Sequence, residues 1–221
     1  MFDGWPPEAL TWFQGIEVNN EKAWWDAHRE TYRTCVRAPL EALLDDLAPE
    51  FGQAKIFRPY RDTRFSADKR PYKENAAATV HGGGGGGADG PGLYVSVSAD
   101  GLEVGAGHYW LARDQVERYR AAAGDPGTGA ELAKLLAELD TLGLAAGGER
   151  LKTAPRGWPR DHPRIGLLRH KSLYVMRHHP PGPWLHGAEA REVVAADWRA
   201  TRPLLDWMER EIGSTTMPMP R

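Results

Sequence analysis

The chain has 221 residues, of which 41% are hydrophobic and 26% charged, and its formal net charge at pH 7 is −2. This composition is ordinary for a globular protein, and no apolar run approaches the roughly 20 residues that a membrane span needs. The N-terminal residues MFDGWPPEAL lack the basic and apolar stretches of a secretory signal. Cys35 is the single cysteine, which excludes an intrachain disulfide and suits a reducing compartment, so we expect a cytoplasmic protein.

Helical signals dominate the first fifty residues. Pro6 and Pro7 open a short helix through about Phe13, with Gly15 as its stop. Asn19 or Asn20 then caps a longer helix, which Pro39 should kink or divide and Pro49 should close. The apolar stripe of this longer helix keeps a spacing of three to four residues. It consists of Trp24, His28, Tyr32, Val36, Leu40, Leu43 and Leu47.

The middle of the chain predicts strands. Residues 55–58 and 75–80 are expected as strands, with an ordered loop over residues 59–73 between them. Residues 93–98 alternate β-forming side chains, and residues 102–109 follow after a short turn, which is typical of a hairpin.

A glycine run separates two of these strands and invites comparison with a phosphate-binding loop. The run HGGGGGGADG begins at His81, but no GK[ST] follows it and no helix opens there, so a phosphate loop is rejected. We expect residues 81–91 to form a flexible hairpin tip.

Two helices, over residues 112–123 and 130–142, follow the hairpin. A brief strand at 151–153, a strand at 172–178 and a closing helix at 188–212 complete the series. This order predicts an α+β fold: a central mixed or antiparallel sheet with a hairpin, flanked by N-terminal and C-terminal helices. We expect one domain over residues 1–213 and a loose tail over 214–221.

Positive charge is concentrated in two short segments. Residues 55–73 hold seven Lys or Arg and two Asp, and residues 150–171 hold seven Lys or Arg and one Asp, while the rest of the chain is acidic. Such an asymmetry gives the protein an electrostatic field with a focus.

The first basic segment, RPYRDTRFSADKRPYK from Arg58, is the leading candidate site. As a folded loop it could gather several cations around one anion, because guanidinium groups match carboxylate and phosphate. The candidate ligand-binding residues are Arg58, Arg61, Arg64, Lys69 and Lys73. Asp62 and Asp68 could orient these cations, or serve as base or metal ligand. The structural alternative is a surface loop of Arg–Asp pairs.

The second basic segment adds Lys152, Arg169 and Lys171 as candidate ligand-binding residues. His162, beside Asp161, could act as an acid–base group, although a structural histidine bonded to the backbone is the commoner case. His108 ends a glycine-rich strand where a ligand or another backbone could approach closely. We expect no metal site, because the histidines lack the spacing of metal ligands.

The sequence also resembles a family. Asn19, Asn20, Trp24 and Trp25, the string RDTRFSADKRPYK from Arg61, GLYVSVSADGL followed by GAGHY, and the DHP…LLRHK segment together resemble the bacterial and fungal family known as domain of unknown function 2461. The resemblance covers residues 7 to 210. It implies one domain with both basic loops in its pattern, and it implies no established activity or catalytic role.

Three functions remain open. The first is an enzyme or binder for a small phosphorylated or carboxylated molecule held where the two basic segments converge, with Asp62, Asp68 or His162 in catalysis. The second is a non-enzymatic module that docks an acidic partner. The third, ranked last, is nucleic-acid binding, which the acidic remainder of the chain opposes. The sequence names no cofactor.

Overall fold

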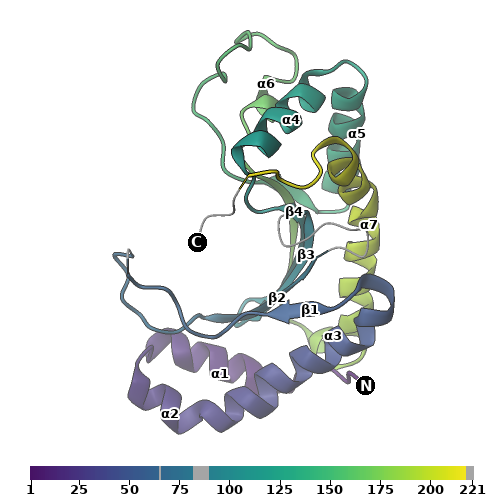
Figure 1. Cartoon of the computed structure of the whole chain (residues 1–221). Coiled ribbons are helices and arrows are strands. Elements are labelled where there is room, and N and C mark those ends of the chain that lie inside the picture. The colour runs from purple at the N-terminus through teal and green to yellow at the C-terminus, as the bar shows by residue number, and fades with distance from the viewer. Residues whose placement is uncertain (65, 82–89, 218–221) are drawn as a thin grey trace. The chain divides into compact units, whose positions relative to one another are not determined.

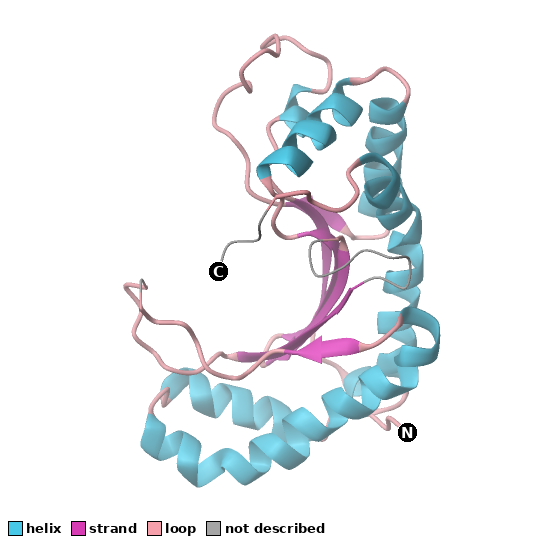
Figure 2. Ribbon diagram, in the orientation of Figure 1, coloured by secondary structure: helices cyan, strands magenta, loops and turns pink. Residues whose placement is uncertain are grey.

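The protein has the α+β fold that its sequence predicts, and the computed structural model describes residues 1–64, 66–81 and 90–217 (Figure 1). Six strands form one antiparallel sheet in the order β1-β2-β3-β4-β6-β5, with helices flanking it (Figure 2). The strands are β1 (Ala54–Ile56), β2 (Asn75–His81), β3 (Gly92–Ser98), β4 (Gly101–His108), β5 (Ala145–Gly147) and β6 (Leu173–His179). The α-helices are α1 (Pro7–Val18), α2 (Lys22–Thr31), α3 (Ala38–Phe51), α4 (Arg113–Gly124), α5 (Thr128–Thr141), α6 (Ile165–Leu168) and α7 (Glu189–Glu211). A π-helix, η1 (Tyr32–Arg37), joins α2 to α3, and a 3₁₀ helix, η2 (Pro183–His186), precedes α7.

Two compact units make up the chain, and each is described by itself. The first unit consists of Met1–Val80, Tyr94–Val104 and His178–Ala196. The second unit consists of His81–Leu93, Gly105–Arg177 and Asp197–Arg221. That residues 1–213 form one domain stays a prediction.

In the first unit, α1 extends further than the sequence predicts. The expected stop, Gly15, lies inside the helix. A Cβ atom at this position would lie 2.4 Å from the indole ring of Trp24. The glycine therefore provides room for an aromatic side chain of the next helix, and its prediction as a helix stop is wrong.

The long helix predicted after α1 forms as the continuous run α2, η1 and α3, and its ends differ from the prediction. Pro39 is the second residue of α3, directly after the π-helical segment, but Arg37 and Ala38 keep helical backbone angles, so the chain is not interrupted at this proline. Pro49 lies inside α3 and does not close it. The residue before α2 is Glu21, and no side chain caps the helix, so the predicted cap by Asn19 or Asn20 is wrong.

The apolar stripe of these helices packs into the core of the first unit. The helices α1 to α3 lie along one face of β1 and β2 (Figures 1 and 2). Trp24 and His28 are only half-buried, and their rings stack with centroids 4.0 Å apart. The fully or nearly buried side chains include Trp5, Trp12, Phe13, Ile16, Trp25, Tyr32, Val36, Leu40, Leu43, Leu47, Ala78, Val80, Val95 and Leu102.

The second unit contains α4 to α6, strand β5, and parts of β4, β6 and α7. The predicted strand at 151–153 is wrong, because β5 lies earlier and residues 150 and 170 form only an isolated bridge. The short helix α6, which the sequence did not predict, ends where the hydroxyl of Tyr119 donates to the carbonyl of Leu167 at 2.8 Å. The core consists of Leu111, Tyr119, Ala122, Ala123, Leu132, Leu136, Leu139, Leu144, Leu168, Leu173, Val175, Leu204, Trp207, Met208 and Ile212.

Two predicted segments, the glycine-rich tip and the C-terminal tail, include residues that the structure does not describe. The predicted glycine-rich tip falls mainly on residues 82–89, which lie outside the described residues. The loose tail over 214–221 stays a prediction, although Thr215 and Thr216 bond to the carboxylate of Asp114, and Arg118 donates to the Ser214 carbonyl. In the described part of the chain, no helix combines the length and apolarity that a bilayer crossing requires.

Candidate functional site

The first basic segment forms a two-stranded ribbon that continues β1 and β2. The regular register of these strands extends to Phe57, whose N–H donates to the carbonyl of Ala77 at 2.9 Å. Further out, Tyr60 pairs with Tyr72 in an isolated antiparallel bridge. Between these two pairs the chain advances three residues on the β1 side, from Phe57 to Tyr60, and five on the β2 side, from Tyr72 to Ala77. The β2 side therefore has two extra residues, which form a bulge at Lys73 and its neighbours. Bulges redirect side chains and are common beside functional sites. We call residues 57–64 and 66–77 the basic ribbon.

The tip of the basic ribbon is built from two copies of one local motif. Asp62 accepts hydrogen bonds from the backbone N–H of Arg64 and from its guanidinium, at 3.2 and 3.0 Å. Asp68 accepts the same two bonds from Arg70, at 3.0 and 3.1 Å. An aspartate that binds the backbone two residues further on makes a turn, and the arginine closes it. The two Asp-x-Arg motifs thus stabilise the turns that begin at Asp62 and Asp68.

Arginine side chains donate hydrogen bonds to both carboxylates of these motifs. The bonds from Arg64 hold the pKa of Asp62 at about 2. Asp68 also accepts a bond of 2.6 Å from Arg61, and the bonds from Arg70 and Arg61 hold its pKa far below the ordinary value. A carboxylate with a lowered pKa is a weak proton acceptor. The geometry therefore supports an orienting role for Asp62 and Asp68, and catalysis by either stays a prediction.

Three other cations of the basic ribbon, Arg58, Lys69 and Lys73, have no carboxylate partner among the described residues. Arg58 and Lys73 make no ion pair with any described residue, whereas Arg61, Arg64 and Arg70 each bind a carboxylate. Lys73 is half-buried, and its Nζ lies 4.9 Å from the ring centroid of Phe57. Its backbone N–H donates to the carbonyl of Pro59 at 2.8 Å, which places it beside Arg58.

The electrostatics of this pair are unfavourable in the free protein. Burial lowers the pKa of Lys73, and the positive charge of Arg58 lowers it further. Arg58 also lowers the pKa of Asp62, but that carboxylate is already bonded to Arg64. Lys69, the remaining predicted cation, donates to the carbonyl of Thr63 at 2.9 Å.

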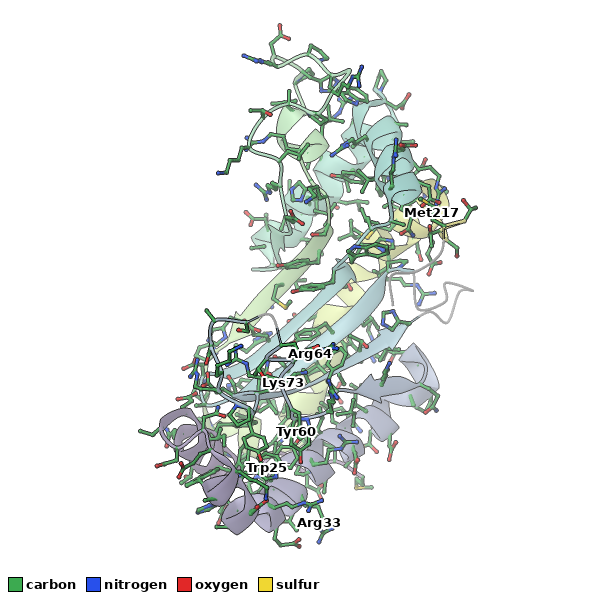
Figure 3. All side chains as sticks on the ribbon, turned by 60° about the vertical axis from the view of Figure 1, so that its left-hand side comes forward. Trp25, Arg33, Tyr60, Arg64, Lys73 and Met217 are labelled. Carbon is green, nitrogen blue, oxygen red and sulfur yellow. The ribbon has the colours of Figure 1, made fainter. Side chains whose placement is uncertain are left out.

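An aromatic cluster fixes the basic ribbon to α2. The ring of Tyr72 stacks on Trp25, and Tyr60, which is 47% exposed, lies across both with centroid distances of 5.3 and 6.0 Å. The amide of Asn20 donates to the carbonyl of Tyr72 at 3.1 Å and accepts its N–H at 3.0 Å. Figure 3 shows Trp25, Tyr60, Lys73 and Arg64 in the same region of the first unit. Sequence reasoning did not identify Asn20 and Trp25 as parts of the site.

The second basic segment also forms a short ribbon, in the second unit. Leu151 donates to the carbonyl of Arg169, and Lys171 to that of Glu149, each at 2.7 Å. The Arg169 guanidinium donates to the carbonyl of Leu151 at 2.6 Å, and Lys171 forms an ion pair with Glu149. Lys152 is exposed. Arg169 and Lys171 therefore hold the ribbon together, and their binding of a ligand stays a prediction.

The two predicted histidines have structural surroundings. The Nδ1 atom of His162 accepts a hydrogen bond of 3.1 Å from the backbone N–H of Arg164, and its ring meets Trp158 edge-on at 5.4 Å. This bond supports the structural alternative for His162. His108 is buried, and the glycines before it allow backbone packing: a Cβ atom at Gly105 would lie 2.3 Å from the carbonyl oxygen of Val175.

One buried histidine escaped the sequence analysis. His170 is 1% exposed, and its Nδ1 lies 2.8 Å from the carbonyl oxygen of Ser172. Burial lowers its pKa, and the charges of Arg150 and Arg169 add to the effect. Among the described residues, no three His, Cys, Asp or Glu side chains are grouped so that they could hold a metal ion.

These observations define an α+β protein with a basic, aromatic-backed ribbon at the sheet edge of its first unit. The chain belongs to the family described as "Conserved hypothetical protein (DUF2461)", whose profile matches residues 8–207, and the resemblance noted from its sequence is thereby confirmed. No curated protein and no solved structure matches it.

Proposed function

We propose that the chain binds a small phosphorylated or carboxylated molecule at the basic ribbon, with Arg58 and Lys73 as its principal cations. The observation that carries the proposal is the contrast within one loop. Arg61, Arg64 and Arg70 are each bound to a carboxylate, whereas Arg58 and Lys73 have no carboxylate partner in the described chain.

The energetic argument concerns like charges. Two cations held close together raise each other's free energy, and the half-buried setting of Lys73 weakens screening by water. An anion between them would remove this repulsion and accept charge-assisted hydrogen bonds from both, each worth roughly 1.5–3 kcal/mol. Burial of the Tyr72 ring against Trp25 holds the ribbon in place before binding, which lowers the entropy cost of forming the site.

The remaining candidates have secondary roles in this proposal. Arg61, Arg64 and Lys69 shape the tip of the basic ribbon through their bonds to Asp68, Asp62 and Thr63. Lys152, Arg169 and Lys171 belong to the second unit, and ligand binding by this second basic segment stays part of the proposal, as does any catalytic use of the ligand. So does the expected cytoplasmic location.

Isothermal titration calorimetry with pyrophosphate and with citrate tests the proposal. Arg58→Ala and Lys73→Met should each weaken binding by roughly 10- to 100-fold, since each removes one charge-assisted bond. Arg33→Ala is the matched control, because this arginine is paired with Glu30 and lies apart from Tyr60, Lys73 and Arg64 in Figure 3. Equal binding by all variants, or none by the wild type, would contradict the proposal.

The same titration separates the alternative functions. A single-stranded oligonucleotide and a Glu-rich peptide are titrated in parallel at several salt concentrations. A polyanion that neutralises several cations loses affinity steeply as salt increases. Tight binding of the oligonucleotide with a steep salt dependence would favour nucleic acid as the partner. Tight binding of the peptide, with no binding of either small anion, would favour an acidic protein.

A further inference from the structure

Lys73 has surroundings unlike those of the other lysines. Lys22, Lys134 and Lys171 form ion pairs with Asp26, Glu138 and Glu149, and Lys69 donates to a carbonyl oxygen. Lys55 and Lys152 are exposed. Within the described part of the chain, Lys73 alone is half-buried with its amine over an aromatic ring, and it lies at the two-residue bulge of the basic ribbon.

Half-burial and the nearby charge of Arg58 favour the unprotonated amine of Lys73, whereas the face of the Phe57 ring favours the ammonium; the net effect lowers the pKa of Lys73. An ammonium group gains from a carboxylate partner and from water; Lys73 has no carboxylate partner among the described residues, and its half-burial removes part of the water. Each unit by which a pKa falls gives about tenfold more free amine at pH 7. Lysines near apolar groups and a second cation are the ones that react with carbonyl compounds.

We propose that Lys73 is a nucleophilic amine that forms an imine with a small anionic aldehyde or ketone, such as a 2-oxo acid. The inference rests on the proposed function, since Arg58 would bind the carboxylate or phosphate of that molecule. The ligand class therefore narrows from any small anion to one that carries a carbonyl group beside its negative charge.

The chemistry requires no oxidant or further reactant. The lone pair of Nζ attacks the carbonyl carbon and forms a C–N bond, while the π bond of the carbonyl breaks and its oxygen takes up one proton in place of one that the nitrogen gives up, which makes a hydroxyl group. The hydroxyl then leaves as water, and the nitrogen has lost both of its hydrogens to that water. The product is a C=N bond between Lys73 and the ligand. The anionic group stays beside Arg58 throughout.

Reductive trapping tests this proposal. The protein is incubated with glyoxylate and sodium cyanoborohydride, digested, and the labelling rate of each lysine is measured by mass spectrometry. Lys73 should label faster than the other lysines, the exposed Lys55 and the paired Lys134 included. Arg58→Ala should slow labelling at Lys73 and leave Lys134 unchanged. Lys73→Arg and Lys73→Met should remove the fast site, with circular dichroism as the check on folding.

The outcomes separate this inference from the proposed function. Labelling that is uniform over the lysines overturns the imine, and the binding proposal survives if pyrophosphate still binds through Arg58. Fast labelling of Lys73 that pyrophosphate slows supports both proposals. Fast labelling that neither pyrophosphate nor Arg58→Ala affects supports a reactive Lys73 but overturns the shared anion site.

Discussion

The ring of Tyr72 lies flat on the indole of Trp25, with centroids 4.4 Å apart and planes only 6° from parallel. The two residues come from the basic ribbon and from α2, and both are nearly buried. Stacked aromatic pairs of this kind stabilise beyond the area that they bury. The stack therefore anchors the ribbon at the residue directly before Lys73, so the position of the candidate site depends on it.

Asn20 should be the polar counterpart of this anchor. Its side chain bonds both the N–H and the carbonyl of Tyr72, so Asn20→Ala would leave both backbone groups unpaired. We expect a loss of about 1–3 kcal/mol in the free energy of unfolding, measured by urea denaturation. The neighbouring Asn19 makes one exposed bond to the carbonyl of Gly15, so Asn19→Ala is the control and should cost less. Equal effects of the two substitutions would argue against an anchoring role.

The two Asp-x-Arg motifs predict separable titrations. Asp62 should titrate at a pKa of about 2 because of its bonds to Arg64, and Arg64→Ala should return it toward its ordinary value. Because the folded pKa is lowered, the stabilisation is present above the unfolded pKa and is lost as pH falls through the folded one. NMR titration of the carboxylates should show an unchanged pKa for Asp68 in the Arg64→Ala variant. Arg70→Ala should instead raise the pKa of Asp68 and leave the pKa of Asp62 unchanged. A common shift of both would contradict independent motifs.

Much of the fold can be predicted from the sequence, since hydrophobic period and turn residues are local signals. The β3–β4 hairpin and helices α4, α5 and α7 follow from such signals. Gly15 misleads because glycine usually ends helices, and nothing local reveals that Trp24 needs its space. His162 looks functional beside Asp161, whereas His170 is buried only through packing of the second unit.

The candidate site was only partly predictable. Its cations were visible as a charge concentration, and the spacing of Asp62 and Arg64 fits a local turn. The sequence did not show which cations bind a carboxylate and which do not, because this depends on the bulge at Lys73 and on the side chains that the ribbon brings together. The contact between Trp25 and Tyr72 joins residues far apart in sequence, which a single chain does not reveal.

Glycine at position 105 should be essential to the second unit. A Cβ atom there would lie 2.3 Å from the carbonyl oxygen of Val175 and 2.8 Å from the sulfur of Met176, so strands β4 and β6 would have to separate. Gly105→Ala should therefore lower the free energy of unfolding by about 1–3 kcal/mol, as overpacking does. Gly166→Ala is the control, because nothing lies within 4 Å of its added Cβ and alanine favours the helix α6. Destabilisation by both would contradict this reasoning.

His170 should make the stability of the second unit depend on pH. Burial lowers its folded pKa, so below about 6.5 the unfolded chain binds more protons than the folded one and stability falls with falling pH. His170→Asn keeps an N–H donor for the carbonyl of Ser172 but does not titrate. Urea midpoints between pH 7.5 and 5 should therefore depend less on pH in the variant. An unchanged slope would show that His170 does not contribute to it.

NMR of the Lys73 ammonium group tests most directly whether Lys73 and Arg58 bind an anion between them. With ¹⁵N-labelled lysine, Lys73→Arg assigns the signal, and the exposed Lys55 is the internal control. The pKa of Lys73 should lie below its ordinary value in the free protein and rise when pyrophosphate is added, because the anion offsets the charge of Arg58. A Lys73 pKa that pyrophosphate leaves unchanged, or that rises no more than that of Lys55, would contradict the account.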